Sequence, residues 1–248
     1  MYRIFLLPFA FSLVACGGGS SGGDNKPPTP STTSSPTTIS SSSSSLNAVK
    51  STDVKEITSN FGAYAALLNN GNVITWGHVD SGGDSSSISH QLTNVVKVYA
   101  SEFAFAALKS DGTVVAWGRK DYGGDASLVQ AELKEVVSIS ASTTRFAAIK
   151  KDSTAVIWGW YIDSTPTNNN FTNIKEIAFT NDNLIIALKK DDSLQFLQIP
   201  QSEVPINEEF TSIIDAEHVV TTYYSFSLIK KDGGIAYSNH DRGDHFLQ

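Results

Sequence analysis

The stretch AALKSDGTVVAWG, residues 106–118, decides the fold because it recurs along the chain. An earlier copy reads AALLNNGNVITWG over residues 65–77, and a later one reads AAIKKDSTAVIWG over residues 147–159. Two looser copies follow, around Ala187-Leu188 and around Ile229. A period of about 40 residues predicts a repeat architecture in which each unit is one small supersecondary structure.

Each unit predicts a small antiparallel meander. In the second copy, β-prone runs at Val95–Val98, Phe103–Lys109 and Thr113–Trp117 are separated by turn residues. Asn70-Gly71, and Asp111-Gly112 in the next unit, stand between two such runs, where a tight hairpin needs a positive φ. No useful stretch has the 3.6-residue period of a helix, so helices are not expected.

Small and large residues recur at fixed places in the unit. The paired alanines mark a strand that a neighbouring unit approaches closely, and the tryptophans are expected to fill the space between neighbouring units. These residues are Ala65-Ala66, Ala106-Ala107 and Ala147-Ala148, with Trp76, Trp117 and Trp158.

Stacked meanders of this period predict an all-β fold, a β-propeller of about five short blades, either a closed ring or an arc. In the repeat register Gln248 falls opposite Ser127, and Leu46 falls opposite Leu128. The folded segment thus begins and ends in the middle of a unit. We therefore predict that residues 46–53 add a strand to the last blade.

The motif at residues 106–118, followed by Tyr122-Gly123-Gly124, resembles the repeat of the regulator of chromosome condensation family, particularly its bacterial members. The resemblance spans about 200 residues and weakens after the third copy, where Phe196-Leu197 replaces Trp-Gly. It implies a propeller, although members of the family usually have seven longer blades. The exchange-factor activity and chromatin binding of eukaryotic members are not implied, because no residue here matches a motif for them.

The beginning of the chain predicts an export signal. Met1-Tyr2-Arg3 is short and basic, and residues 4–15 form an apolar run that only Pro8 and Ser12 interrupt. A membrane-spanning helix needs about 20 apolar residues, so this run is too short to be an anchor. The single cysteine, Cys16, follows it directly and excludes an internal disulfide.

The residues Leu13-Val14-Ala15-Cys16 resemble the lipobox of bacterial lipoproteins. The resemblance implies cleavage before Cys16 and lipidation of its thiol, with palmitate-like acyl chains that anchor the protein in a lipid bilayer. Gly17 after the cysteine favours the bacterial outer membrane, with the protein facing the periplasm or the cell surface. A plain secretory signal with an incidental cysteine is the alternative.

Composition divides the chain into three parts: the signal peptide at 1–15, the lipidated cysteine with a tether at 16–45, and the repeat propeller domain at 46–248. The tether consists almost entirely of Gly, Ser, Thr and Pro, and it ends in six serines. Such a segment cannot bury enough apolar surface to fold, so we expect it to be a disordered spacer.

Charge and motif content exclude several function classes. The net charge of −7, which becomes −8 without residues 1–15, argues against a nucleic acid partner because a phosphate-binding protein carries a basic face. No Ser-His-Asp order with a nucleophile elbow and no phosphate-binding glycine loop is present. The His240–His245 tail is the nearest approach to a metal site and is expected to be solvated. The sequence predicts no enzyme, no cofactor and no metal.

Two features are candidate binding sites. Asp84 and Asp125 belong to Gly-Gly-Asp turns that could line one rim of the propeller, although turn geometry alone explains them. Trp160 and Tyr161 follow Trp158 in an aromatic cluster that could stack on sugar rings, although packing between blades is the favoured interpretation.

The leading hypothesis is a membrane-anchored envelope lipoprotein that acts as a non-enzymatic scaffold and binds an unknown protein partner. The alternative is a carbohydrate-binding or carbohydrate-active envelope protein, which requires carboxylates and aromatic rings to converge.

Overall fold

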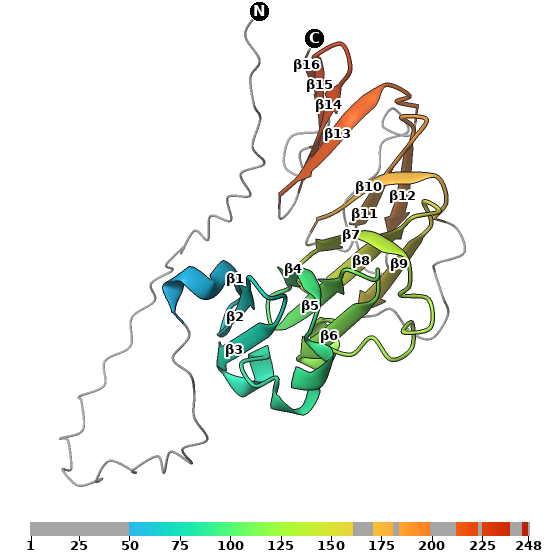
Figure 1. Cartoon of the computed structure of the whole chain (residues 1–248). Coiled ribbons are helices and arrows are strands. Elements are labelled where there is room, and N and C mark those ends of the chain that lie inside the picture. The colour runs from blue at the N-terminus through green and yellow to red at the C-terminus, as the bar shows by residue number, and fades with distance from the viewer. Residues whose placement is uncertain are drawn as a thin grey trace, which may run out of the picture. The chain divides into compact units, whose positions relative to one another are not determined.

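The computed structural model describes residues 50–160, 171–180, 184–198, 212–222, 225–238 and 245–247. The chain divides into two units, Met1–Ser45 and Leu46–Gln248, and all described residues belong to the second (Figure 1). Within the described residues, no helix combines the length and apolar character that crossing a bilayer would need.

Five antiparallel sheets, here called blades 1 to 5, follow one another along the chain. Blade 1 contains β1 (Val54–Ser59), β2 (Ala63–Leu68) and β3 (Val73–Gly77). Blade 2 contains β4 (Val95–Ala100), β5 (Ala104–Lys109) and β6 (Val114–Gly118). Blade 3 contains β7 (Val136–Ala141), β8 (Arg145–Lys150) and β9 (Ala155–Gly159). Blade 4 contains β10 (Ile174–Phe179), β11 (Leu184–Lys189) and β12 (Leu194–Gln198). Blade 5 contains β13 (Ala216–Thr221), β14 (Phe226–Lys230), β15 (Ile235–Tyr237) and β16 (His245–Leu247).

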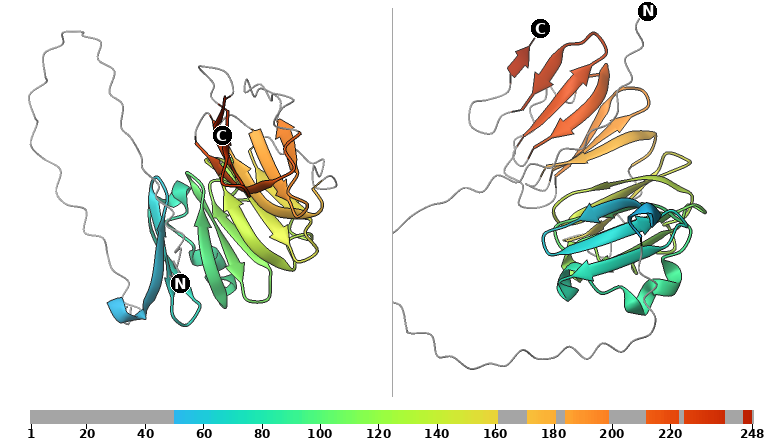
Figure 2. Two further views of the ribbon diagram at one scale, coloured as in Figure 1. Left: turned by 90° about the horizontal axis from the view of Figure 1, so that it is seen from above. Right: turned by 60° about the vertical axis from the view of Figure 1, so that its left-hand side comes forward.

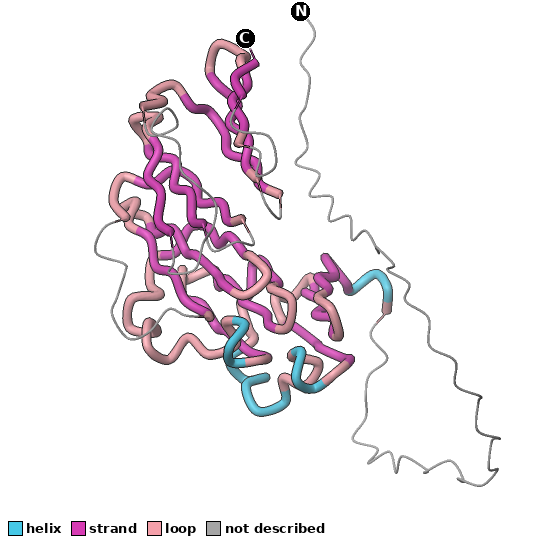
Figure 3. Tube along the Cα trace, turned by 180° about the vertical axis from the view of Figure 1, so that it is seen from behind, coloured by secondary structure: helices cyan, strands magenta, loops and turns pink. Residues whose placement is uncertain are grey.

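The remaining elements are four short 3-10 helices, η1 (Ser51–Asp53), η2 (Val79–Ser81), η3 (Ser86–Gln91) and η4 (Lys120–Tyr122). They lie in loops and not within the sheets (Figure 3). The all-β propeller fold predicted from the repeats is therefore confirmed. The strands of blade 2 agree with the predicted runs to within a residue or two at each end.

Every blade repeats the same local geometry. The register of the first strand against the second shifts at its second residue in all five blades, for example between Val54 and Glu56. Gly71 and Gly112 take positive φ in the following turn, as the sequence predicted. In blade 3 a serine, Ser153, holds the same left-handed position with a φ of 67°, so glycine is favoured there but is not essential.

The core lies between the blades rather than inside any one of them. Four buried apolar clusters separate consecutive blades, and each contains side chains from two neighbours. Ala65 and Ala106 are completely buried, which confirms that small residues let adjacent sheets approach closely. Trp117 and Trp158 are buried at blade boundaries as predicted.

Trp76 departs from that prediction, because 42% of its surface is exposed. It occupies the same position in blade 1 that Trp117 occupies in blade 2, since each pairs with the second residue of its central strand, Tyr64 or Phe105. No described blade precedes blade 1, so within the described part of the chain no neighbouring blade covers this indole.

The prediction that residues 46–53 add a strand to the last blade is wrong for residues 50–53, the part of that segment that the structure describes. Residues 51–53 form helix η1, and the fourth strand of blade 5 is β16, which pairs with β15. Each described blade has at least three strands of its own, and residues 50–53 complete none of them. Residues 46–49 lie outside the described residues.

The blades form an ordered series. Substantial contacts between blades join consecutive ones, such as β2 with β4, β4 with β7, β8 with β10 and β10 with β13. Blades 1 and 5 stand at the two ends of this series (Figure 2). The described sheets thus correspond to the arc rather than to the closed ring.

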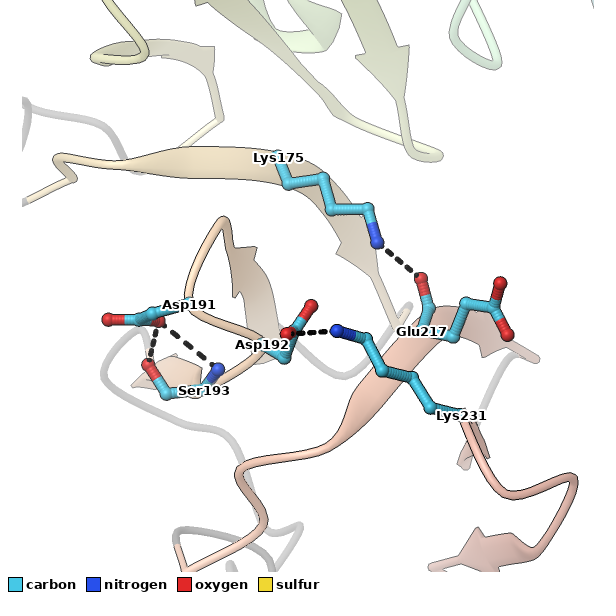
Figure 4. Close-up of polar contacts among 6 residues, drawn as sticks. All are labelled: Lys175, Asp191, Asp192, Ser193, Glu217 and Lys231. Carbon is cyan, nitrogen blue, oxygen red and sulfur yellow. Dashed lines mark hydrogen bonds and ion pairs between the residues drawn. The ribbon is translucent and has the colours of Figure 1, made fainter.

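Polar contacts reinforce the boundary between blades 4 and 5 (Figure 4). The Lys175 ammonium donates to the backbone carbonyl of Glu217 at 3.0 Å, and Lys231 pairs with Asp192. Asp191 organises the adjacent turn, where its carboxylate accepts hydrogen bonds from Ser193. These residues bridge strands and turns of the fold, and we assign them a structural role.

Candidate functional site

A tryptophan hydrogen bond fixes the loop that forms the candidate site. Gly123 directly follows helix η4 and takes a φ of 87°, and the Trp158 indole of blade 3 donates to its carbonyl at 3.0 Å. This bond holds the loop after blade 2 against the end of blade 3. The loop after blade 1 is held in the same way, through Trp117 and Gly82.

A cleft of about 480 Å³ opens between that loop and the end of β9. One wall is the loop after β6, and the other is the end of blade 3. The lining residues are Lys120, Asp121, Asp125, Ala126, Ser127, Leu128, Val129, Trp158, Gly159 and Trp160. Leu128 is 75% exposed and Trp160 is 44% exposed, so the cleft presents apolar surface to solvent.

The charged part of the cleft is an ion pair. The Lys120 ammonium lies 3.2 Å from an Asp125 carboxylate oxygen, and the other oxygen accepts the Ser127 backbone N–H at 2.9 Å. Hydrogen bonds from the side chain and backbone of Ser127, with the Lys120 charge, hold the pKa of Asp125 below its usual value. Asp125 is therefore ionised at neutral pH and oriented by its own turn.

The backbone of Trp160 is anchored while its indole stays exposed. Its N–H donates to the Thr144 carbonyl at 3.1 Å, and its carbonyl accepts a hydrogen bond of 2.8 Å from Arg145 Nε. At the equivalent position in blade 2 stands Arg119, whose guanidinium lies over the rings of Phe103 and Tyr122. Blade 2 therefore has no equivalent of the exposed indole of blade 3.

The structure brings two of the predicted site residues together and separates a third. Asp125 and Trp160 line the same cleft, although 35 positions separate them in the sequence. Asp84 lies in the equivalent turn after blade 1, where it accepts the Ser86 N–H. Hydrogen bonds from Ser86 lower the pKa of Asp84. Tyr161 and Cys16 lie outside the described residues.

Two structural explanations were predicted for these residues: turn geometry for the aspartates of the Gly-Gly-Asp turns, and packing between blades for the aromatic cluster. The Gly-Gly-Asp turns do combine a left-handed glycine with an aspartate that binds the local backbone, as expected of turn geometry. Packing between blades describes Trp158, which is 2% exposed, whereas Trp160 follows the end of β9 and is 44% exposed.

Sequence reasoning did not select Lys120, Leu128 or Arg145. Lys120 and Leu128 flank the Gly-Gly-Asp turn, and only the folded loop shows that they share its cleft. Arg145 was detectable, because it stands where blades 1 and 2 have Ala63 and Ala104. A charged residue at a position otherwise filled by buried alanine marks a local change in structure.

The described residues hold no group of three or more His, Cys, Asp or Glu side chains arranged to bind a metal ion. The His240–His245 tail lies mostly outside the described residues, and the side chain of His245 is not described. What the cleft does offer is an apolar surface beside a fixed pair of opposite charges, which suits binding.

Comparison with solved structures shows that the fold is similar to that of yeast RCC1 (Prp20), among others. Prp20p from Saccharomyces cerevisiae aligns with a TM-score of 0.51 and 17% identity over 74% of this chain and 56% of that one. Human WBSCR16 aligns with a TM-score of 0.51 and 12% identity over 79% of this chain and 67% of that one. Yeast RCC1 (Prp20) bound to Kap60 aligns with a TM-score of 0.49 and 16% identity, over 74% of this chain and 55% of that one.

The likeness is one of fold alone, since the identities lie between 12% and 17%. The chain spans a little more than half the length of the Prp20 structures that it matches. No protein-family model matches the sequence, and no curated protein matches it.

Proposed function

We propose that this protein is a lipid-anchored, non-enzymatic scaffold of a bacterial cell envelope that binds a protein partner at the cleft beside Trp160. The observation that carries the proposal is the exposure of Trp160 and Leu128 around the Lys120–Asp125 ion pair. Binding hot spots of protein interfaces are enriched in tryptophan, and the rim of such an interface is polar. The cleft has this composition.

The fold supports a protein ligand as well. Propellers present loops on rigid sheets, and Prp20p, which has a similar fold, binds Gsp1p and histones. For the present chain, the partner is identified only by chemistry: an apolar side chain that fits beside Trp160, next to groups that complement Lys120 and Asp125.

The anchor is part of the proposal and rests on Leu13-Val14-Ala15-Cys16. Several acyl chains on Cys16 would hold the protein on the membrane, because each buried CH₂ contributes about 0.8 kcal/mol. We expect radiolabelled palmitate to label the wild-type chain, and Cys16→Ser to abolish both the label and recovery in the membrane fraction. An unlabelled wild-type chain would refute the anchor.

The binding site is tested by affinity capture from envelope extracts. We expect the wild-type chain to recover a defined partner reproducibly. The amount of that partner recovered with Trp160→Ala should be at least ten-fold lower. Val137→Ala is the matched control, because Val137 is an exposed apolar residue of blade 3 outside the cleft. Equal recovery by wild type and Trp160→Ala would show that the cleft is not the binding site.

One observation favours a carbohydrate ligand as a second candidate. An exposed indole can stack on a sugar ring, and an ionised carboxylate beside it can accept hydrogen bonds from the hydroxyl groups of the sugar. Titration with a panel of envelope polysaccharides, followed by tryptophan fluorescence, separates the candidates. A saturable change in fluorescence that Trp160→Ala removes would favour a carbohydrate ligand. No change in fluorescence with any polysaccharide of the panel would favour a protein ligand.

A further inference from the structure

The outer face of blade 1 carries the apolar side chains of a blade boundary but has no described blade against it. We call this surface the front face. It consists of Ile57, Tyr64, Ile74 and Trp76, which are 55%, 47%, 37% and 42% exposed. The rings of Tyr64 and Trp76 stack with centroids 5.4 Å apart.

The same positions in the following blades are buried. The strand pairings place Ile57, Tyr64 and Trp76 in register with Val98, Phe105 and Trp117 of blade 2. Those three residues are at most 5% exposed, and they pack against the alanines of blade 1. Blade 3 repeats the arrangement with Ile139, Phe146 and Trp158. The front face is thus one half of an interface that the chain builds repeatedly.

Blade 5 presents the other half of that interface. We call this surface the back face, formed by Ser225, Ser227, Ile229 and Ile235. The strand pairings place these residues in register with Ala63, Ala65, Leu67 and Val73 of blade 1, all buried beneath blade 2. The back face keeps the same order of two small and two aliphatic residues. Ile229 and Ile235, however, are 38% and 41% exposed.

We propose that the front face of one molecule docks on the back face of a second copy of this chain, so that the stack of blades continues from molecule to molecule. The two faces have the complementary sizes that each internal boundary uses, large rings on one side and small residues on the other. Exposed apolar patches rimmed by polar residues mark such association sites.

In the described structure the chain's own blade 5 does not cover the front face, because blades 1 and 5 stand at opposite ends of the series (Figure 1). Closing the chain on itself would change the four boundaries between consecutive blades, whereas a second copy can dock without altering any of them. A contact between unlike faces is heterologous and therefore builds rings or open chains of molecules.

Helix η1 makes this contact weaker than an internal boundary. In blades 2 to 5 the N–H of the first strand residue donates to the turn of the preceding blade, as Val95 does to the Gly71 carbonyl at 2.8 Å. In blade 1 the equivalent N–H, that of Val54, donates instead to Ser51 of η1. Docking at the front face therefore lacks one backbone hydrogen bond that the internal boundaries have, and we expect the association to be reversible and concentration-dependent.

The first test measures the mass of the full-length chain in mild detergent by sedimentation velocity. We expect the mass to rise above that of the monomer with concentration, and Ile57→Asp or Ile235→Asp to abolish the rise. Val137→Asp is the matched control, since Val137 is also an exposed β-branched residue in the first strand of a blade. A monomer at every concentration, or equal loss with Val137→Asp, would overturn the proposal.

The second test identifies which faces meet. Two differently tagged copies are co-expressed, one with Ile57→Cys and one with Ile229→Cys, and treated with a short bis-maleimide; the wild-type chain is treated alike to identify any product that forms through Cys16. Because β2 contacts β4 inside the chain, β14 of one copy should lie against β1 of the next, and a product carrying both tags is expected. Products from Ile57→Cys alone would show front faces meeting each other. An intramolecular link confined to a chain carrying both cysteines would show ring closure, and either result overturns the proposal.

Discussion

The Trp117 indole of blade 2 donates a hydrogen bond of 3.1 Å to the carbonyl of Gly82, which belongs to the loop after blade 1. Gly82 takes a φ of 87°, so its carbonyl points toward the blade that follows. Trp158 and Gly123 repeat this relationship across the next boundary. In blades 2 and 3 a tryptophan thus fixes the loop of the preceding blade, which ties the position of the loops to the packing of the sheets.

Replacing Trp117 by phenylalanine should destabilise the fold. The change keeps a ring at the boundary but leaves the buried Gly82 carbonyl without its donor, a loss of about 1–3 kcal/mol in the free energy of unfolding. Trp76→Phe is the control, because the exposed Trp76 lies outside any boundary between described blades. Urea denaturation measures both variants, and equal midpoints would contradict the role of the hydrogen bond.

A methyl group on Gly82 should also destabilise the boundary. A Cβ there would lie 2.9 Å from the Phe105 ring and 3.2 Å from the Trp117 ring, at a φ that favours glycine. Gly233 has nearly the same φ but no atom within 4 Å of such a Cβ. Gly82→Ala should therefore lower the melting temperature clearly more than Gly233→Ala, which bears only the backbone strain of about 1 kcal/mol. A larger effect at Gly233 would contradict this packing.

Much of the fold was predictable because the repeat fixes it. A bulge, a left-handed turn and a buried alanine at constant positions specify each meander locally, and Trp117 follows the pattern. The ends were not predictable in this way. The register placed residues 46–53 on blade 5, but periodicity says nothing about which strand pairs at an edge, and β16 takes that place.

The candidate site was predictable only in part. Asp125 and Trp160 stand out by residue type, but their common cleft depends on the loop that Trp158 holds against blade 3. The signal that could have identified this site is a change of residue type between equivalent positions of the repeats. Trp160 replaces Arg119, and Arg145 replaces the alanine of the earlier blades.

Acid should weaken the fold through the repeated turns. Asp111, Asp152 and Asp191 each accept hydrogen bonds from the side chain and backbone of the residue two positions on, which lowers their pKa. Because the folded chain binds these protons less tightly than the unfolded chain, the stabilisation is present above about pH 4 and is lost as pH falls through the folded pKa values.

Urea denaturation between pH 5 and pH 2.5 checks this expectation. The loss of stability with falling pH should be shallower in Asp152→Asn and shallower still in the triple variant Asp111→Asn, Asp152→Asn, Asp191→Asn. The amide of asparagine keeps the acceptor oxygen but does not titrate. The dependence of the free energy of unfolding on pH should therefore become weaker with each turn that is altered. An identical slope in wild type and the triple variant would contradict the assignment.

Replacing Arg145 should raise the stability of the fold and weaken partner binding. Its side chain is 2% exposed, its Nε donates to the Trp160 carbonyl, and its Nη2 has no hydrogen-bond partner among the described residues. Burial lowers the pKa of Arg145 to about 10. A buried, incompletely paired charge costs stability, so Arg145→Met should raise the free energy of unfolding at pH 7 by about 1 kcal/mol.

The pH dependence follows from the same burial. The unfolded chain holds the Arg145 proton more tightly than the folded chain, so wild type regains stability as pH rises above about 10. The advantage of Arg145→Met should therefore shrink between pH 8 and pH 11, measured as the difference between the two urea midpoints. At the same time the variant removes the hydrogen bond that anchors Trp160, so partner capture through the cleft should weaken. A variant that is less stable at pH 7 would show instead that the bond to Trp160 outweighs the buried charge.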